Sequence, residues 1–334
     1  MKRFECNECS TIVNFDNTEC LTCGAHLGFD PDSLSMLCYR DVAPNGFHIC
    51  ANADLGGCNW LVKEGEGDFC KACRLNSIVP DLSNDEFVER WRALEAAKRF
   101  FLYGLIRLGL PIVSREEDPE EGLAFELLAD DPGSPDGGHV LTGHDNGVIT
   151  INIAEASSPE REARREALGE PMRTLVGHFR HESGHYYWNR LVRDGGKLEA
   201  ARAVFCDERD EYSQALERYY ADGAPLDWQS NFISAYASSH PWEDFAESWA
   251  HYLHMIDGLD TAFDHGVMPA GMQFSFDPYQ GEDIEKMTSA WAALSVAVNA
   301  INRSIGQPDL YPFVFSASIV QKLGFIQGII HRTI

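Results

Sequence analysis

The sequence of 334 residues is poor in basic side chains and lacks a long apolar run. Lysine and arginine total 27 against 52 aspartate and glutamate residues, which gives a formal net charge of −25. A surface with this excess of negative charge repels nucleic acids and anionic membranes. We therefore expect neither as a partner. The longest apolar stretches, around residues 100–110 and 323–330, are too short or too interrupted to span a bilayer.

The pattern of a secretory signal peptide is also missing. The sequence MKRFECNECS leads directly into cysteines and has no apolar stretch. We therefore expect a cytoplasmic location, where thiols stay reduced. In that compartment ten cysteines do not predict a disulfide framework. Nine of them precede residue 74, and their spacing suggests metal binding.

Two Cys-x2-Cys pairs lie near the start of the chain. Cys6 and Cys9 form the first pair, and Cys20 and Cys23 form the second. Each pair presents two thiolates from one tight turn, and two such pairs complete a tetrahedral zinc site. Because four thiolates leave no coordination position open, we expect this zinc to be structural.

A second set of cysteines follows. Cys70 and Cys73 form another Cys-x2-Cys pair, whereas the two cysteines before them are spaced more loosely. The preferred ligands of a second structural zinc are Cys50, Cys58, Cys70 and Cys73. Cys38 or His48 could replace one of these four. A segment this short would have little core without its metals.

The cysteine spacing predicts a zinc-ribbon module at residues 1–80 and a second domain at residues 81–334. Since basic residues are few in the module, we expect it to dock on the rest of the chain or on a partner protein. Residues 85–108 have the apolar spacing of a helix, which Ser83 or Asn84 can cap.

Short strands are predicted at residues 123–129, 140–142 and 147–154. Most of the remaining patterns are helical. The expected fold class is therefore α+β, in which zinc ribbons precede a mostly helical domain with a small sheet.

A predicted helix over residues 172–192 carries the sequence HFRHESGH. His181 and His185 are four residues apart and share a helix face, so both imidazoles can reach one zinc. Glu182 lies beside the metal and can act as a general base without ligating it. A match of this length can also arise by chance on a polar helix face, so the hypothesis needs a third ligand.

The helix-like run PWEDFAESWAHYLH at residues 241–254 supplies candidates for that ligand. Glu243 and Glu247 are four residues apart and share a face. In zincins with a glutamate ligand, this residue lies on a helix downstream of HExxH, and a carboxylate one turn later commonly orients a ligand histidine. We assign these roles to Glu243 and Glu247 respectively. His251 could replace Glu243 as ligand, and a solvated acidic face is the other alternative.

The segment SAYASSHPWEDFAESW at residues 234–249 resembles the third-ligand region of the lethal-factor protease family. In that family a tyrosine precedes the glutamate ligand by seven residues, and Phe-Ala-Glu follows it. The sequence HESGH likewise resembles that family's active-site helix, including the glycine before the second histidine. By this resemblance Tyr236 would donate its phenol to the oxyanion of the tetrahedral intermediate. An ordinary half-buried tyrosine is the alternative.

Over nearly its full length the chain resembles the bacterial family of zinc-binding metallopeptidases with an N-terminal zinc-ribbon domain. The features that carry this resemblance are the ribbon cysteines, CNWLV from Cys58, CKACRLN from Cys70, PDLS from Pro80, HFRHESGHYYW and the EDFAESWAH run. The resemblance implies hydrolysis of peptide bonds by a zinc-activated water, with Glu182 as general base.

The predicted cofactors are three Zn²⁺ ions, one catalytic and two structural. The substrate is expected to be a peptide or protein, and the ribbons could bind a protein partner. We expect the strand at residues 147–154 to lie at the edge of its sheet, where an extended peptide could pair with it. Two alternatives remain: a non-catalytic interaction protein on a zincin scaffold, and a nucleic-acid-binding ribbon protein, which the acidic excess disfavours.

Overall fold

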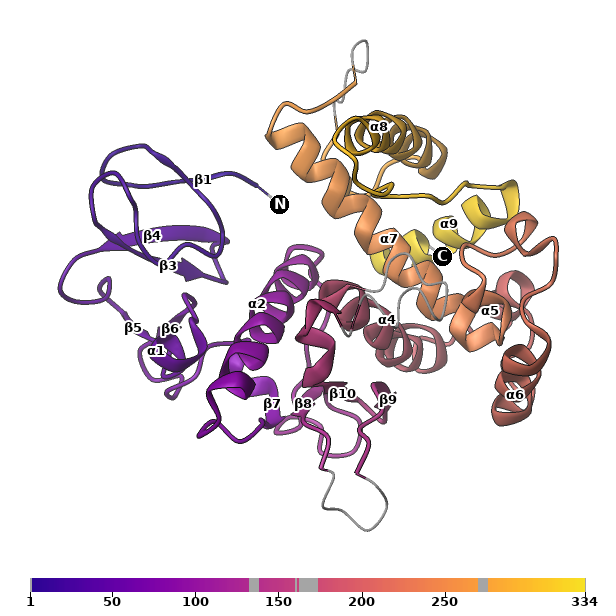
Figure 1. Ribbon diagram of the computed structural model, residues 1–334, viewed down its shortest axis with the longest axis horizontal. Helices are drawn as coiled ribbons and strands as arrows, with labels where there is room; N and C mark the ends of the chain where they lie inside the picture. The colour runs from indigo at the N-terminus through magenta and orange to yellow at the C-terminus, as the bar shows by residue number, and fades with distance from the viewer. Residues whose placement is uncertain (1, 132–137, 160, 162–173, 270–275, 334) are drawn as a thin grey trace. The chain divides into compact units, whose positions relative to one another are not determined.

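The computed structural model of the chain describes residues 2–131, 138–159, 161, 174–269 and 276–333. The chain divides into two compact units, residues 2–164 and 165–334 (Figure 1). Among the described residues, no helix is both long and apolar enough to cross a membrane. The domain boundary at residue 80 remains a prediction.

The first unit begins with short elements and irregular chain. Three two-stranded antiparallel sheets form, in chain order, from β1 (Phe4–Glu5) and β2 (Ile12–Val13), β3 (His26–Asp30) and β4 (Ser35–Tyr39), and β5 (Phe47–Ile49) and β6 (Leu61–Lys63). A single helical turn, α1 (Ala53–Gly56), and a 3₁₀ turn, η1 (Cys73–Leu75), complete this part. So little regular structure leaves side-chain packing, and the metal ligation expected from the sequence, to hold it together.

Aromatic side chains pack these short elements onto helix α2 (Asp85–Arg107). The ring centroid of Phe15 lies 4.8 Å from that of Phe29 and 5.3 Å from that of Tyr103 on α2. Trp60, which is fully buried, lies 5.2 Å from Phe29, centroid to centroid. The cysteine-rich segment therefore docks on the chain's own α2, which is one of the two docking modes expected from the sequence.

Helix α2 begins where the sequence predicts. Of the two candidate caps, Asn84 is the one used, because its side chain accepts hydrogen bonds from the backbone N–H groups of Glu86 and Phe87. Inside the unit, Lys98 and Glu95 form a buried ion pair at 2.7 Å. The amide of Asn76 donates to the same carboxylate at 2.9 Å, so each buried charge has a partner.

The sheet of this unit has the strand order β7-β8-β10-β9. Its strands are β7 (Asn76–Ile78), β8 (Ala124–Leu128), β9 (Gly143–Asp145) and β10 (Val148–Asn152). Strand β10 is parallel to β8 and antiparallel to β9. The prediction that residues 147–154 form an edge strand is therefore wrong, because β10 has a neighbour on each side.

The cause is a tight hairpin turn. Asn146 and Gly147 both have positive φ, 44° and 88°, as a two-residue type I′ turn requires. This turn pairs Asp145 with Val148, so the preceding strand lies at residues 143–145 and not at the predicted 140–142. The short 3₁₀ helix η2 (Ile153–Ala156) then packs against α2.

The second unit is helical. Its helices are α4 (Leu175–Tyr187), α5 (Leu198–Phe205), α6 (Tyr212–Asp222), α7 (Pro241–Asp264), α8 (Ile284–Ser304) and α9 (Ala317–His331). Its shorter elements are the π-helix η3 (Trp188–Arg193) and the 3₁₀ turns η4 (Trp228–Ser230), η5 (Tyr236–Ser238) and η6 (Pro278–Gln280). The helix predicted at residues 172–192 thus begins at Leu175, and residues 172–173 lie outside the described residues.

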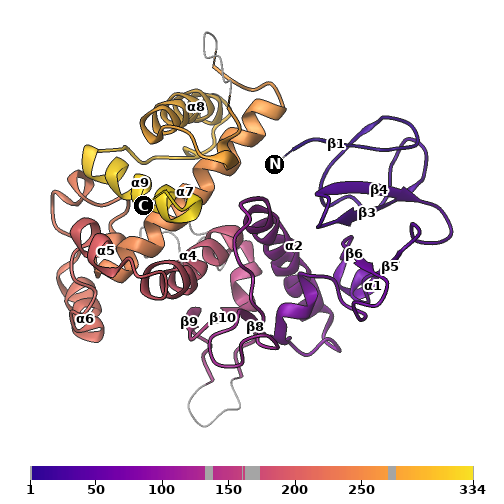
Figure 2. The same cartoon turned by 180° about the vertical axis from the view of Figure 1, so that it is seen from behind.

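Helix α7 is the centre of the second unit. Helices α4, α5, α8 and α9 all pack against it, and Figures 1 and 2 show α4, α8 and α9 around it from both sides. Accordingly, the consecutive residues Trp249, Ala250, His251 and Tyr252, which point in four directions around α7, are all buried. Mostly helical packing beside small sheets confirms the predicted α+β class.

Candidate metal centre

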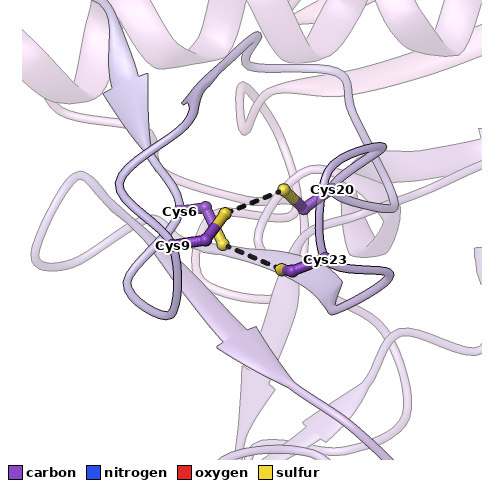
Figure 3. A group of neighbouring side chains, drawn as sticks. All are labelled: Cys6, Cys9, Cys20 and Cys23. Atoms are coloured by element: carbon purple, nitrogen blue, oxygen red, sulfur yellow. Dashed lines mark hydrogen bonds between the residues drawn. The ribbon is translucent and has the colours of Figure 1, made fainter.

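The structure brings the first four cysteines together. The Sγ atoms of Cys6 and Cys23 lie 3.6 Å apart, as do those of Cys9 and Cys20 (Figure 3). All four sulfur atoms lie within 4.8 Å of one another. Tetrahedral Zn–S bonds of about 2.3 Å place sulfur atoms about 3.8 Å apart, so the four thiols fit a zinc ion.

The second group of cysteines has the same spacing and is more deeply buried. The Sγ atom of Cys58 lies 3.6 Å from that of Cys70 and 3.7 Å from that of Cys73. With Cys50, these sulfur atoms lie within 4.8 Å of one another, and all four residues are buried. The geometry again fits a zinc ion with four thiolate ligands.

Neither alternative ligand of the second group belongs to it. Cys38 lies at the first group instead, with its Sγ atom 3.4 Å from that of Cys6. The Nε2 atom of His48 lies 2.8 Å from the carbonyl oxygen of Gly67. The structure thus brings together the four preferred cysteines and places the two alternatives elsewhere.

The third group lies between α4 and α7. Thr174 caps α4 by accepting from the backbone N–H of Gly177 at 2.9 Å. The spacing of four residues, close to one helical turn of 3.6 residues, then places His181 and His185 on one face, with ring centroids 5.2 Å apart. At the start of α7, Pro241 occupies the first turn and His240 caps it, so Glu243 also lies in the first turn.

A glycine allows the two helices to cross closely. A Cβ atom at Gly184 would lie only 2.7 Å from the Cα atom of Ala246 on α7. Any larger side chain would therefore push α4 away from α7. This is the physical reason for the glycine in HESGH, and the close crossing brings the histidine face of α4 opposite Glu243 and Glu247.

The donor atoms of this group converge. Nε2 of His181 lies 3.0 Å from Oε2 of Glu243, and Nε2 of His185 lies 3.5 Å from its Oε1. Ligand atoms about 2.1 Å from a tetrahedral zinc lie about 3.4 Å apart, so the spacing fits a zinc ion. Nδ1 of His181 lies 2.6 Å from Oε1 of Glu247, the kind of partner that a metal-ligating histidine commonly has.

The pKa values of two carboxylates of this site are shifted in opposite directions. Burial raises the pKa of Glu182, which is 9 % exposed, and the neighbouring histidines only partly oppose this. At Glu243 burial acts in the same direction, but His185 and His181 outweigh it and hold the pKa well below its usual range. Glu243 is thus suited to be a permanent anion, whereas Glu182 is suited to exchange a proton.

Glu182 also lies within reach of the histidine donors. Ligand atoms of His181, Glu182 and His185 lie within 4.8 Å of one another. Tyr236 is half-buried, and its ring centroid lies 5.9 Å from that of His181. Burial, followed by the charge of Glu243, raises the pKa of its phenol far above the ordinary value, so it stays a hydrogen-bond donor.

Two residues of the site were missed by the sequence analysis. The hydroxyl of Tyr212 donates to Oε1 of Glu243 at 2.7 Å. The hydroxyl of Ser234 donates to Oε2 of Glu247 at 2.5 Å. Tyr212 had no motif to mark it, whereas Ser234 opens the segment that resembles the lethal-factor family.

The alternative third ligand, His251, lies away from this group of donor atoms. It lies on α7 beyond Glu247, and its Nδ1 atom is 2.7 Å from the hydroxyl of Tyr311. Burial lowers the pKa of His251 to about 4, so it is neutral near pH 7. His251 therefore has a packing partner of its own.

Comparison with known proteins agrees with this geometry. Residues 87–329 match the model of a family described as putative zinc-binding metallo-peptidase, and residues 3–84 match that of a zinc-ribbon domain. The chain belongs to this metallopeptidase family. The resemblance inferred from the sequence is thereby confirmed, and the family supports zinc binding by the chain.

Three relatives span almost the whole chain. They are described as uncharacterized proteins, one from Mycobacterium bovis and two from strains of Mycobacterium tuberculosis. Each is 41% identical over 332 residues, which cover 99% of this chain and 95% of the relative. No solved structure matches the chain.

Proposed function

We propose that this member of the metallopeptidase family is an active zinc-dependent peptidase whose catalytic zinc is held by His181, His185 and Glu243. The observation that supports this most is the convergence of their donor atoms, 3.0 and 3.5 Å apart, from two different helices. Three protein ligands leave one position open, as catalytic zinc sites do. When bound, zinc would supply a Lewis acid that polarises the scissile carbonyl and lowers the pKa of a water molecule.

The surrounding side chains have separate roles in this proposal. Glu247 accepts a hydrogen bond from the Nδ1–H group of His181, so that the Nε2 lone pair is directed at the metal. Glu182 accepts a proton from water and passes it to the leaving amine, a role that its raised pKa favours. Tyr236 donates its phenol to the oxygen that becomes negative in the tetrahedral intermediate.

The two cysteine groups would hold structural zinc ions, which gives three zinc ions per chain. Their four thiolates leave no position for substrate. The substrate of the catalytic site is proposed to be a peptide or protein. The zinc-ribbon module at residues 1–80 could also bind a protein partner.

Metal analysis and Glu182→Gln test this function together. Wild type and variant should both contain three zinc ions per chain, because Glu182 is not a ligand. Peptide hydrolysis should fall by about 10²- to 10⁴-fold in the variant, the range that general acid–base catalysis supplies. Glu285→Gln, at an exposed position on α8, is the matched control.

Unchanged peptide hydrolysis in Glu182→Gln would show that Glu182 is not the general base. A wild-type protein with three zinc ions that cleaves nothing in a broad peptide library would instead favour the non-catalytic scaffold. Salt-sensitive binding of nucleic acid would favour the ribbon protein that binds nucleic acid.

A further inference from the structure

The connection between α5 and α6, residues 206–211, is anchored at two points before it reaches the metal site. We call this connection the strap. Arg202 on α5 donates two hydrogen bonds to the carboxylate of Glu208, at 2.9 and 2.5 Å. The backbone oxygen of Asp210 lies 3.1 Å from Nε2 of His240. Two anchors within three residues restrict where the end of the strap can lie.

His240 joins the strap to the start of α7. Its Nδ1 atom accepts from the backbone N–H of Trp242 at 3.1 Å and so caps the helix. Because Nδ1 accepts, the neutral ring carries its proton on Nε2, which then donates to Asp210. One imidazole thus fixes both the first turn of α7, which holds Glu243, and the backbone two residues before Tyr212.

Tyr212 follows the strap as the first residue of α6. Its ring lies edge-on to those of His240 and Trp242, with centroids 5.2 and 5.8 Å away. Trp242 in turn lies against His185, with ring centroids 4.1 Å apart. Packed in this way, the phenol donates to Oε1 of Glu243 at 2.7 Å.

This hydrogen bond gives the two oxygens of the Glu243 carboxylate different partners. Glu243 is only 1 % exposed. Oε1 of Glu243 accepts from Tyr212 and lies 3.5 Å from Nε2 of His185, while Oε2 is closer to a histidine, 3.0 Å from Nε2 of His181. A carboxylate whose second oxygen is engaged offers a metal one oxygen, and the fourth position stays open. Without the phenol, both oxygens could bind the metal and the carboxylate could rotate.

We infer that Tyr212 is a positioning residue, which the strap and His240 hold in place so that Glu243 binds the metal through one oxygen. This inference rests on the metal site of the proposed function. It assigns to the loop between α5 and α6 a part in metal binding that no sequence motif marks.

Metal binding to Tyr212→Phe tests the inference without relying on activity. Zinc affinity at the histidine–glutamate site is measured by chelator competition, with the cysteine groups left loaded with zinc. Loss of a partner that orients a ligand typically weakens metal binding about 10- to 100-fold, and we expect this for Tyr212→Phe. Tyr220→Phe, which removes a hydroxyl from the same helix at a residue that is 64% exposed, should bind zinc as wild type does.

Cobalt provides a second readout. When Co²⁺ refills the histidine–glutamate site, a second carboxylate oxygen raises the coordination number and weakens the visible absorption bands. We expect weaker bands in Tyr212→Phe than in wild type or Tyr220→Phe. Affinity and spectrum indistinguishable from wild type in Tyr212→Phe would overturn the inference.

His240→Asn is a second variant, which tests the inference independently in case Tyr212→Phe fails to fold. Asparagine can still cap α7, but it is too short to reach Asp210. It should move both readouts in the same direction as Tyr212→Phe, and unchanged readouts would show that the strap does not hold Tyr212. If wild type itself binds no metal through His181 and His185, the proposed function fails before the inference is tested.

Discussion

The cysteine groups and the histidine–glutamate site hold their side chains in different ways. Each cysteine group draws four thiols from a short stretch of chain, residues 6–23 or 50–73, with little regular structure around them. The other site joins α4 and α7, and its donors have further partners in Glu247 and Tyr212, while Ser234 donates to Glu247. We therefore propose that bound metal would maintain the fold at the cysteine groups, whereas the fold maintains the arrangement of the donor atoms between the helices.

Removing one ligand from each kind of site should give the largest contrast. Cys70→Ser should lose a zinc ion and unfold the first 80 residues, because structural zinc contributes about 10–16 kcal/mol of apparent binding free energy to such modules. His181→Ala should lose the catalytic zinc and peptide hydrolysis, yet unfold at nearly the wild-type temperature. Zinc content, limited proteolysis and thermal unfolding measure the difference. A Cys70→Ser protein that keeps a protease-resistant N-terminal part would abolish the contrast.

The helical site is stabilised in part by a buried ion pair. Nζ of Lys322 on α9 lies 2.6 Å from Oδ2 of Asp244, and the two side chains are 6 % and 2 % exposed. Lys322→Met would leave Asp244, the residue after Glu243, without its counter-charge. We expect the free energy of unfolding to fall by about 1–3 kcal/mol at pH 8, where the Asp244 carboxylate of the wild type is ionised, and Asp244→Asn/Lys322→Met to recover most of it.

The pH dependence of this loss has a definite sign. Burial raises the pKa of Asp244 to about 7 even beside Lys322, and removal of the lysine would raise it further. The cost of burying the carboxylate is present above this pKa and disappears as the group is protonated. Denaturation of Lys322→Met should therefore show a smaller deficit at pH 5 than at pH 8, and an equal deficit would point to lost packing.

The close crossing of α4 and α7 is tested by Gly184→Ala. The added Cβ would meet the backbone of Ala246 at 2.7 Å, so we expect a loss of about 1–3 kcal/mol in the free energy of unfolding. Displacement of α4 should also weaken zinc binding there and leave the cysteine groups loaded. Gly324→Ala on α9 is the control, because its Cβ would meet a neighbour at an ordinary 3.5 Å. Equal stability of the two variants would show that the crossing is not tight.

The same contrast explains what the sequence could predict. Cysteine spacing is local, so it predicted both groups of four thiols that the structure brings together. Helical periodicity places Glu243 and Glu247 on one face, and the family resemblance directs attention to them. Tyr212 reaches the site through the strap, and a hydroxyl at the end of a loop leaves no periodic pattern. The position of β10 also depends on β8, a partner that lies more than twenty residues away.

The smallest expected effect is that of replacing Cys38, which tests whether this thiol belongs to the ligands of the first cysteine group. Its Sγ atom lies 3.4 Å from that of Cys6 and accepts from the backbone N–H of Asn7 at 3.1 Å, so it lies against the first group without belonging to a Cys-x2-Cys pair. If the two pairs hold the zinc, Cys38→Ser should keep it and change the free energy of unfolding by less than about 1 kcal/mol, whereas Cys23→Ser should lose it. Loss of zinc from Cys38→Ser would mean that the first group selects four ligands from five thiols. In that case its ligand set, like that of the helical site, depends on the fold around it.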